Sequence, residues 1–335
     1  MTHAVDPVKA ARIVRRAVEE CLADIPDDRL VLVGVSGGAD SLALAQAVAS
    51  TDRPCAAAII DHGLQADSAD VATRAAGECA RLGLDPVVVE RVDASAKGSG
   101  PEAAAREARR SAFERIADRL GAAAILLAHT RDDQAETVLL RLARGSGARS
   151  LAAMSAVTGR WRRPLLDVPR DVVRASASGL AVWEDPHNLD PAYARTRVRH
   201  EALPALVETL GPDVVSGLAR SARLLGDDAD ALDALAREAA TAVVASDGSL
   251  DVGGLASLPR ALRTRILRSA AVTAGCPAGA LTSAHVDRLE ALVSDWRGQG
   301  AVDLPGGLAG ERAYGRLAIR RVPPVAERRR HDREE

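Results

Sequence analysis

Serine, glycine and aspartate residues at positions 34–41 carry the strongest chemical signal in the chain. They lie in LVLVGVSGGADSLAL, residues 30–44, where an apolar run meets a Ser-Gly-Gly turn and a second apolar segment. This order predicts a buried strand, a tight loop and a helix N-terminus, which together bind an anion through backbone N–H groups and hydroxyls. The residues predicted to bind phosphate are Ser36, Gly37, Gly38, Ala39, Asp40 and Ser41.

The loop has no lysine beside it, which distinguishes it from the Walker A pattern. Lys9 and Lys97 are the only lysines in the whole chain. Backbone amides, arginines and a divalent cation must therefore neutralise a bound phosphate, and Asp40 is the candidate ligand for that cation. A plain glycine turn between a strand and a helix would explain Gly34 and Gly37, but it would not require Asp40.

Polar side chains also follow two other predicted strands. Asp61 and His62 end the apolar run at 55–60, and His129 follows the run at 123–128. Because ligands bind at the carboxyl ends of parallel strands, we expect these side chains near the phosphate loop. His129 could act as a general base, contact phosphate or simply hydrogen-bond a neighbour.

An acidic cluster opens the helix predicted after His129. Asp133 and Glu136 are three residues apart and share one helix face, and Asp132 lies in the first turn, where the helix dipole favours a carboxylate. A solvated acidic turn that merely caps the helix would have the same sequence. Because the cluster follows the end of a third strand in the same sheet, we expect it to face the same cleft as Ser36 and Asp61.

Composition limits the class of protein. A length of 335 residues and 47% hydrophobic residues favour about two globular domains with sizeable cores. The four cysteines are far apart, so neither a disulfide frame nor a zinc or iron–sulfur site is indicated. The N-terminus matches neither a signal peptide nor a membrane span, so we expect a cytoplasmic protein without membrane contact.

Charge is unevenly distributed along the chain. The net charge of −2 argues against a strongly basic nucleic-acid binder, yet residues 101–200 hold 17 arginines against 12 acidic residues. Only 2% of the residues are aromatic, so base stacking would fall to a few rings or to arginine planes. The middle of the chain is therefore the candidate surface for an anionic partner.

The alternation of apolar strands and amphipathic helices predicts an α/β protein with a doubly wound parallel sheet. We assign residues 1–210 to this catalytic domain and place a joint at Gly211 and Pro212. Residues 211–322 are predicted to form an α-rich accessory domain that ends in a small β region. The tail, 323–335, is charged and is predicted to be disordered.

Six blocks in order resemble the bacterial tRNA(Ile)-lysidine synthetases, a branch of the N-type ATP pyrophosphatases with a Rossmann-like fold. The SGGADS loop at 36–41 alone marks the superfamily, whereas DDQAET at 132–137 and EDPHN at 184–188 narrow the resemblance to this branch. The other blocks are IDHGL at 60–64, AAAREAR at 103–109 and RPLL at 163–166. The resemblance covers residues 28–210 and weakens beyond them.

The resemblance implies a reaction in two steps. ATP, with Mg²⁺ on Asp40, adenylates the C2 oxygen of the wobble cytidine in the isoleucine tRNA with a CAU anticodon. The lysine ε-amine then displaces AMP, and the product base reads AUA instead of AUG. The resemblance implies ATP binding by residues 36–41, Asp61 and His62, lysine binding by Asp133 and Glu136, and catalytic roles for Asp40, Arg109, His129 and Asp133.

Arginines beside this cleft are expected to contact the tRNA backbone. A solvated arginine face would explain either basic run, RWRRPLL at 160–166 or ARTRVRH at 194–200, equally well. The expected contacts are Arg144, Arg162, Arg163, Arg195, Arg197 and Arg199.

The oligomeric state is open, with a homodimer as one candidate. Departures from the family pattern occur at Gln65, Arg110, Thr130, His187 and Thr196.

Two other readings compete. Another N-type pyrophosphatase, such as a tRNA thiolation enzyme or an amidotransferase-type synthetase, would share the loop. However, the scattered cysteines do not supply the paired or persulfide thiols of thiolation, and the glutaminase domain is missing. A catalytically silent RNA-binding module would not need SGGADS or DDQAE. ATP binding with and without Mg²⁺ separates these readings.

Overall fold

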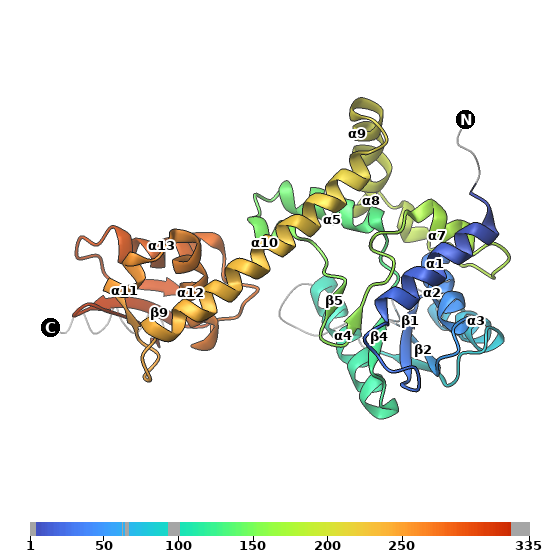
Figure 1. The fold of residues 1–335 in the computed structure, drawn as a ribbon, viewed down its shortest axis with the longest axis horizontal. Coiled ribbons are helices and arrows are strands. Elements are labelled where there is room, and N and C mark those ends of the chain that lie inside the picture. Colours follow the sequence, from blue (N-terminus) through green and yellow to red (C-terminus); the bar gives the residue numbers. More distant parts are fainter. Residues whose placement is uncertain (1–4, 62, 64–66, 93–100, 323–335) are drawn as a thin grey trace. The chain divides into compact units, whose positions relative to one another are not determined.

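The computed structural model describes residues 5–61, 63, 67–92 and 101–322, and the chain divides into two compact units (Figure 1). The first unit comprises Met1–Gly226 and the second Asp227–Glu335, so the division falls inside one long helix, α10, Val214–Val243. His62, Gln65 and the tail at 323–335 lie outside the described residues.

A six-stranded sheet forms the centre of the first unit. Its strand order is β3-β2-β1-β4-β6-β5, and all neighbours are parallel except β5 and β6. The strands are β1 (Val31–Val35), β2 (Cys55–Asp61), β3 (Val87–Arg91), β4 (Ala124–Leu126), β5 (Val157–Thr158) and β6 (Trp161–Arg162).

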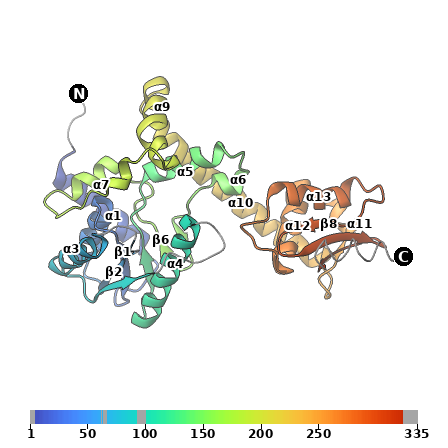
Figure 2. The same ribbon diagram turned by 180° about the vertical axis from the view of Figure 1, so that it is seen from behind.

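Alternating side chains of β1 pack into cores on both faces of the sheet. Val31, Val33 and Val35 join the core formed with α1 (Pro7–Cys21), α2 (Ala39–Ala49), α3 (Ser68–Arg81) and α7 (Arg170–Ser176). Leu32 joins Phe113 and Ile116 of α4 (Pro101–Leu120) on the opposite face. Figure 2 shows the same layers from behind. A strand buried on both faces explains the uninterrupted apolar run in the sequence.

The strand order places one junction at the centre of the sheet. The chain leaves β1 for β2 on one side, and β4 later pairs with the other side of β1. Loops after β1 and β4 therefore leave the sheet in opposite directions, which opens a crevice at their carboxyl ends. The helices that follow are α2 and α5 (Arg131–Leu142), and they bring residues 36–41 and 129–136 to this crevice.

Shorter helices complete the first unit. They are α6 (Ala148–Leu151), a 3₁₀ turn η1 (Pro186–Leu189), α8 (Ala194–Arg197), a π-helical turn η2 (Val198–Ala202) and α9 (Leu203–Leu210). The π turn η2 joins α8 directly to α9, and both α8 and η2 contact α5. Basic residues from the ARTRVRH run are thereby brought to the acidic end of α5.

The second unit combines helices with a four-stranded antiparallel sheet of order β7-β10-β9-β8. The strands are β7 (Leu250–Asp251), β8 (Val302–Leu304), β9 (Leu308–Ala313) and β10 (Arg316–Arg321). The helices α11 (Val252–Ser257), α12 (Arg260–Thr273) and α13 (Ser283–Ser294) share a core with them that includes Leu267, Leu289 and Leu317.

The predicted fold class is confirmed. The first unit is a doubly wound, mainly parallel α/β sheet, and the second is rich in helices with a small β region at its end. Within the described residues, no helix is both long enough and apolar enough to span a bilayer.

Candidate active site

The loop between β1 and α2 is held in shape by its own serines. Ser41 Oγ accepts hydrogen bonds from Ser36 N at 3.1 Å and Ser36 Oγ at 3.2 Å, and it donates to the Gly38 carbonyl at 2.9 Å. Helix α2 begins after Gly38 without a side-chain cap. Its first N–H groups have no partner inside the helix, so they point at the crevice as an anion site.

Two glycines are required in this region for different reasons. Gly37 has a φ of +84°, a conformation that L side chains rarely adopt. At Gly34, an added Cβ would lie 2.9 Å from both Leu127 Cδ2 and Phe113 Cζ, which is closer than any normal contact. One glycine therefore shapes the turn, and the other lets α4 pack closely on β1.

Asp40 lies in the first turn of α2 beside this cradle. Its Oδ1 is buried and has no hydrogen-bond partner among the described residues, and its Oδ2 lies 3.9 Å from Arg170 Nε. Burial raises the pKa of the Asp40 carboxyl to about 6, against the opposing effect of the Arg170 charge. A buried, unsatisfied carboxylate oxygen beside a phosphate cradle fits a hard cation such as Mg²⁺.

The described residues contain no group of three or more His, Cys, Asp or Glu side chains that could enclose a metal ion. A cation at Asp40 would therefore complete its shell with phosphate oxygens and water, as Mg²⁺ commonly does. Asp61 is buried at the end of β2, and its Oδ1 accepts a hydrogen bond from Gly63 N at 2.9 Å. His62, its predicted partner in ATP binding, lies outside the described residues.

Asp133 and Glu136 meet two arginines in the interior. Glu136 is fully buried, and its carboxylate accepts hydrogen bonds from Arg170 Nη1 at 2.9 Å and Arg199 Nε at 2.7 Å. Asp133 Oδ1 accepts from Arg170 Nη2 at 2.6 Å and Arg199 Nη2 at 3.1 Å. The acidic face expected on this helix is thus neither solvated nor free, because two guanidinium groups already cover it.

Thr130 explains why Asp133 has a fixed orientation. The Thr130 N–H and hydroxyl both donate to Asp133 Oδ2, at 2.8 and 2.9 Å, in a capping box that starts α5. Although burial opposes it, the charge of Arg170 and these hydrogen bonds lower the pKa of Asp133. The threonine that departs from the family pattern therefore has a local structural role.

His129 and Arg109 are enclosed near the same end of the sheet. The His129 Nδ1 atom is buried without a hydrogen-bond partner among the described residues, and burial lowers the pKa of its imidazole to about 4. The imidazole is therefore neutral at physiological pH. Arg109 lies over the Phe113 ring at 5.6 Å, and burial together with the charge of Arg106 lowers its pKa.

The basic residues predicted to contact RNA divide into three groups. Arg162 is buried and pairs with Asp24 at 2.8 Å, and Arg199 is committed to the Asp133 and Glu136 carboxylates, so neither presents its guanidinium to an outside partner. Arg195 is half-exposed and reaches Thr137 Oγ1 at 3.1 Å. The remaining three, which have no acidic ion-pair partner among the described residues, are Arg144, Arg163 and Arg197.

Arg170 is the principal site residue that sequence reasoning missed. It lies 34 and 37 residues from its two carboxylate partners, in a segment without its own motif. Its position four residues after the end of the RPLL block was the only available signal. Trp183, directly before the EDPHN block, was missed as well. Its backbone N–H donates to the Gly37 carbonyl at 3.0 Å and so ties this segment to the phosphate loop.

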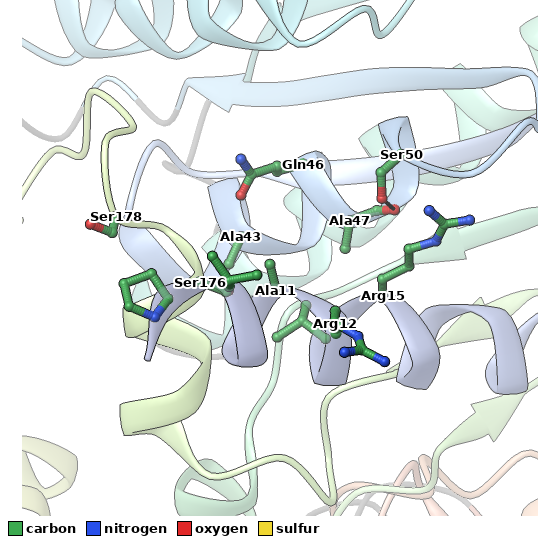
Figure 3. Close-up of a pocket in the computed structure, with 12 residues that line it drawn as sticks. Ala11, Arg12, Arg15, Ala43, Gln46, Ala47, Ser50, Ser176 and Ser178 are labelled. Atoms are coloured by element: carbon green, nitrogen blue, oxygen red, sulfur yellow. Dashed lines mark hydrogen bonds between the residues drawn. The ribbon is translucent and has the colours of Figure 1, made fainter. Parts of the chain in front are cut away.

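A separate depression of about 410 Å³ lies between α1, α2 and the end of α7 (Figure 3). Arg12, Arg15 and Gln46 line it, together with Ser176 and Ser178. No carboxylate of the site described above is among its lining residues in the described part of the chain. We therefore locate the chemistry at the crevice beside the phosphate loop.

Comparisons with known proteins cover both units. Residues 10–206 match the model of the PP-loop domain, and residues 250–318 match that of the TilS substrate binding domain. The tRNA(Ile)-lysidine synthase of Thermobifida fusca is 55% identical over 320 residues, which is 93% of this chain and 98% of that protein. The same enzyme of Salinispora arenicola is 54% identical over 95% of this chain and 98% of that protein.

Matches at lower sequence identity are consistent with these relatives. The tRNA(Ile)-lysidine synthase of Mycobacterium tuberculosis is 46% identical over 87% of this chain and 91% of that protein. Among solved structures, the U34-tRNA thiolase NcsA from Methanococcus maripaludis aligns with a TM-score of 0.54 at 20% identity, over 65% of this chain and 80% of that one. At that identity the likeness concerns the fold alone.

Proposed function

The chain belongs to the tRNA(Ile)-lysidine synthase family, and on that premise we propose which residues carry each part of the reaction. The enzyme is an ATP-dependent ligase that forms a C–N bond on tRNA(Ile). The C2 oxygen of the wobble cytidine attacks the α-phosphorus of ATP and pyrophosphate leaves. The lysine ε-nitrogen then attacks C2, loses its proton and expels AMP, which leaves lysidine.

For adenylation, we assign the triphosphate to the loop at residues 36–41. The uncapped N-terminus of α2 offers backbone N–H donors to phosphate oxygens, and Asp61 borders the same crevice. Asp40 would hold Mg²⁺ through its unsatisfied Oδ1. When bound, the cation neutralises charge that develops on the leaving pyrophosphate.

For the second step, we assign lysine to the cluster of Asp133, Glu136, Arg170 and Arg199. Free lysine carries both ammonium groups and a carboxylate, so a recognition site needs both signs of charge. Asp133 and Glu136 supply the negative sign, and Arg199, the more exposed of the two arginines that bind them, supplies the positive sign, while Arg170 holds both carboxylates. The observation that carries this assignment is the complete burial of Glu136 among charged partners. Burying such charges costs free energy, and clusters of this kind are typical of functional sites.

The proton of the ε-ammonium must leave before attack, because the ordinary lysine pKa is about 10.4. With a pKa of about 4, the imidazole of His129 is a weak proton acceptor, so we propose that it contacts the cytidine or a phosphate as a neutral group. Arg109 is proposed to stabilise the adenylated intermediate from the α4 side, near His129.

For tRNA binding, the proposal retains Arg144, Arg163, Arg195 and Arg197. Arg163 supports it best, because its guanidinium donates to the Ser155 carbonyl at 2.9 Å and has no carboxylate partner among the described residues, while Arg106 and Arg110 repel its charge. Such a group is stabilised by an incoming phosphate. We also propose a cytoplasmic location, with a homodimer as one candidate oligomeric state.

The direct test is to incubate the purified protein with CAU-anticodon isoleucine tRNA, ATP, Mg²⁺ and isotopically labelled lysine. We expect label on the wobble cytidine in nucleoside mass analysis. Release of AMP without incorporation of lysine would contradict the assigned function and point to another adenylating enzyme. An absence of any ATP turnover would contradict it too and favour a silent binding module.

A further inference from the structure

Arg170 has an unusually fixed position for a long side chain. It opens α7, whose buried residues Val173 and Ser176 face the packed α1 and α2 helices. The Arg170 backbone N–H also donates to Asp132 Oδ2 at 2.8 Å, which joins the start of α7 to the start of α5. The guanidinium group therefore extends from an anchored helix end into the crevice.

All three nitrogens of its guanidinium face carboxylates of the site. Nη1 and Nη2 donate to Glu136 and Asp133 at 2.9 and 2.6 Å, and Nε lies 3.9 Å from Asp40 Oδ2. The Nε atom is buried and makes no hydrogen bond among the described residues, as is also true of Asp40 Oδ1. The two Nη groups are thus engaged, and the third donor is left facing the phosphate loop.

The charges of the cluster require this arginine. Asp133 and Glu136 are both nearly or fully buried and lie one turn apart on α5, so two negative charges there repel each other. Arg199 also binds both, but its side chain is more exposed, 23% against 13% for Arg170. Arg170 is therefore the inner of the two clamps.

We propose that Arg170 is a positioning residue that fixes the two carboxylates of the lysine site and links them to the phosphate loop through Asp40. This inference rests on the proposed function, because it presupposes that Asp133 and Glu136 bind lysine. Two fork-like donors set the spacing of the carboxylates, which a single ammonium group could not do. The third donor, Nε, lies 3.9 Å from Asp40 Oδ2, too far for a hydrogen bond, so it acts on the phosphate loop through its charge alone.

The experiment compares Arg170→Gln with the unaltered enzyme in two assays. Pyrophosphate release from ATP and tRNA without lysine reports adenylation, and incorporation of labelled lysine at varied lysine concentrations reports the second step. We expect the KM for lysine to rise at least tenfold, while adenylation falls no more than about threefold. Arg170→Lys should give an intermediate KM.

Arg263→Gln is the matched control. Arg263 is a partly buried arginine of the second unit, with a side chain as little exposed as that of Arg170, and it donates two hydrogen bonds to Glu290, at 2.9 and 2.5 Å. Its loss removes a comparable ion pair, so we expect lower stability with an unchanged KM for lysine. A rise in KM in both variants would indicate a purely structural effect and overturn the proposal.

The remaining outcomes separate this inference from the function itself. An unchanged or lower KM for lysine in Arg170→Gln, with an unaltered enzyme that makes lysidine, would refute the role of Arg170 alone. Failure of the unaltered enzyme to incorporate lysine would refute the assigned function. If Arg170→Gln does not fold, Arg170→Lys decides, because an unchanged KM in that variant overturns the proposal.

Discussion

At the scale of single residues, the site contains buried polar groups without partners, which lower the stability of the ligand-free protein. Asp40 has a buried oxygen without a partner, and His129 has an unpartnered ring nitrogen, among the described residues. Burial raises the pKa of Asp40 to about 6 and lowers that of His129 to about 4. Shifts in pKa of this kind cluster at functional sites, where a ligand supplies the hydrogen bonds or charge that buried polar groups lack in the free protein.

Asp40→Asn should therefore stabilise the ligand-free protein while it abolishes adenylation. The folded-state pKa of about 6 exceeds the ordinary value of 3.8, so stability from the protonated carboxyl is present at low pH and lost as pH rises through 6. We expect a gain of about 2 kcal/mol at pH 7.5 and little at pH 4. Urea unfolding at both pH values measures it, and equal gains at the two would contradict the account.

At the scale of elements, the strand, loop and helix at residues 31–49 could be predicted because periodicity and glycine placement are local signals. The pairing of Glu136 with Arg170 could not, since it depends on how α7 packs 34 residues later. The alternation of side chains along β6 could not be predicted either, because a strand of two residues is too short to show a period in the sequence. Arg162 and Arg163 looked alike in sequence and face different surroundings in the fold.

Gly34→Ala should destabilise the sheet by about 1–3 kcal/mol, because the new methyl group would overlap Leu127 and Phe113. The matched control is Gly77→Ala in α3, where a Cβ meets nothing within 4 Å. That variant should be neutral or more stable by up to about 1 kcal/mol. Chemical unfolding distinguishes them, and equal effects would show that close packing of α4 on β1 is unimportant.

Arg163→Gln should weaken tRNA binding and reduce the slope of log Kd against log salt concentration by about one, as expected for one lost phosphate contact. Its neighbour provides the control. Arg162 is buried against Asp24, so Arg162→Gln should leave the salt slope unchanged. Filter binding at several salt concentrations measures both slopes. Equal slopes for the two variants would remove Arg163 from the RNA surface.

At the scale of the whole molecule, the net charge of −2 is an average over an uneven distribution, because the first unit has a local excess of arginine. The second unit has a different architecture. Composition could predict that a nucleic-acid partner must meet local basic surface. It could not predict which arginines are free, because Arg170 and Arg199 pair with buried carboxylates and Arg162 pairs with the exposed Asp24. Function therefore depends on how charges pair within the fold.

The most direct test of the account is the lysine dependence of Glu136→Gln, with Glu290→Gln as the control for loss of a buried carboxylate. Pyrophosphate release and incorporation of labelled lysine are measured side by side on the CAU-anticodon isoleucine tRNA. The account predicts that Glu136→Gln still adenylates the tRNA within a few-fold of the unaltered rate, while lysine incorporation at low lysine falls at least tenfold. An unchanged dependence on lysine would contradict the assignment of this cluster as the lysine site.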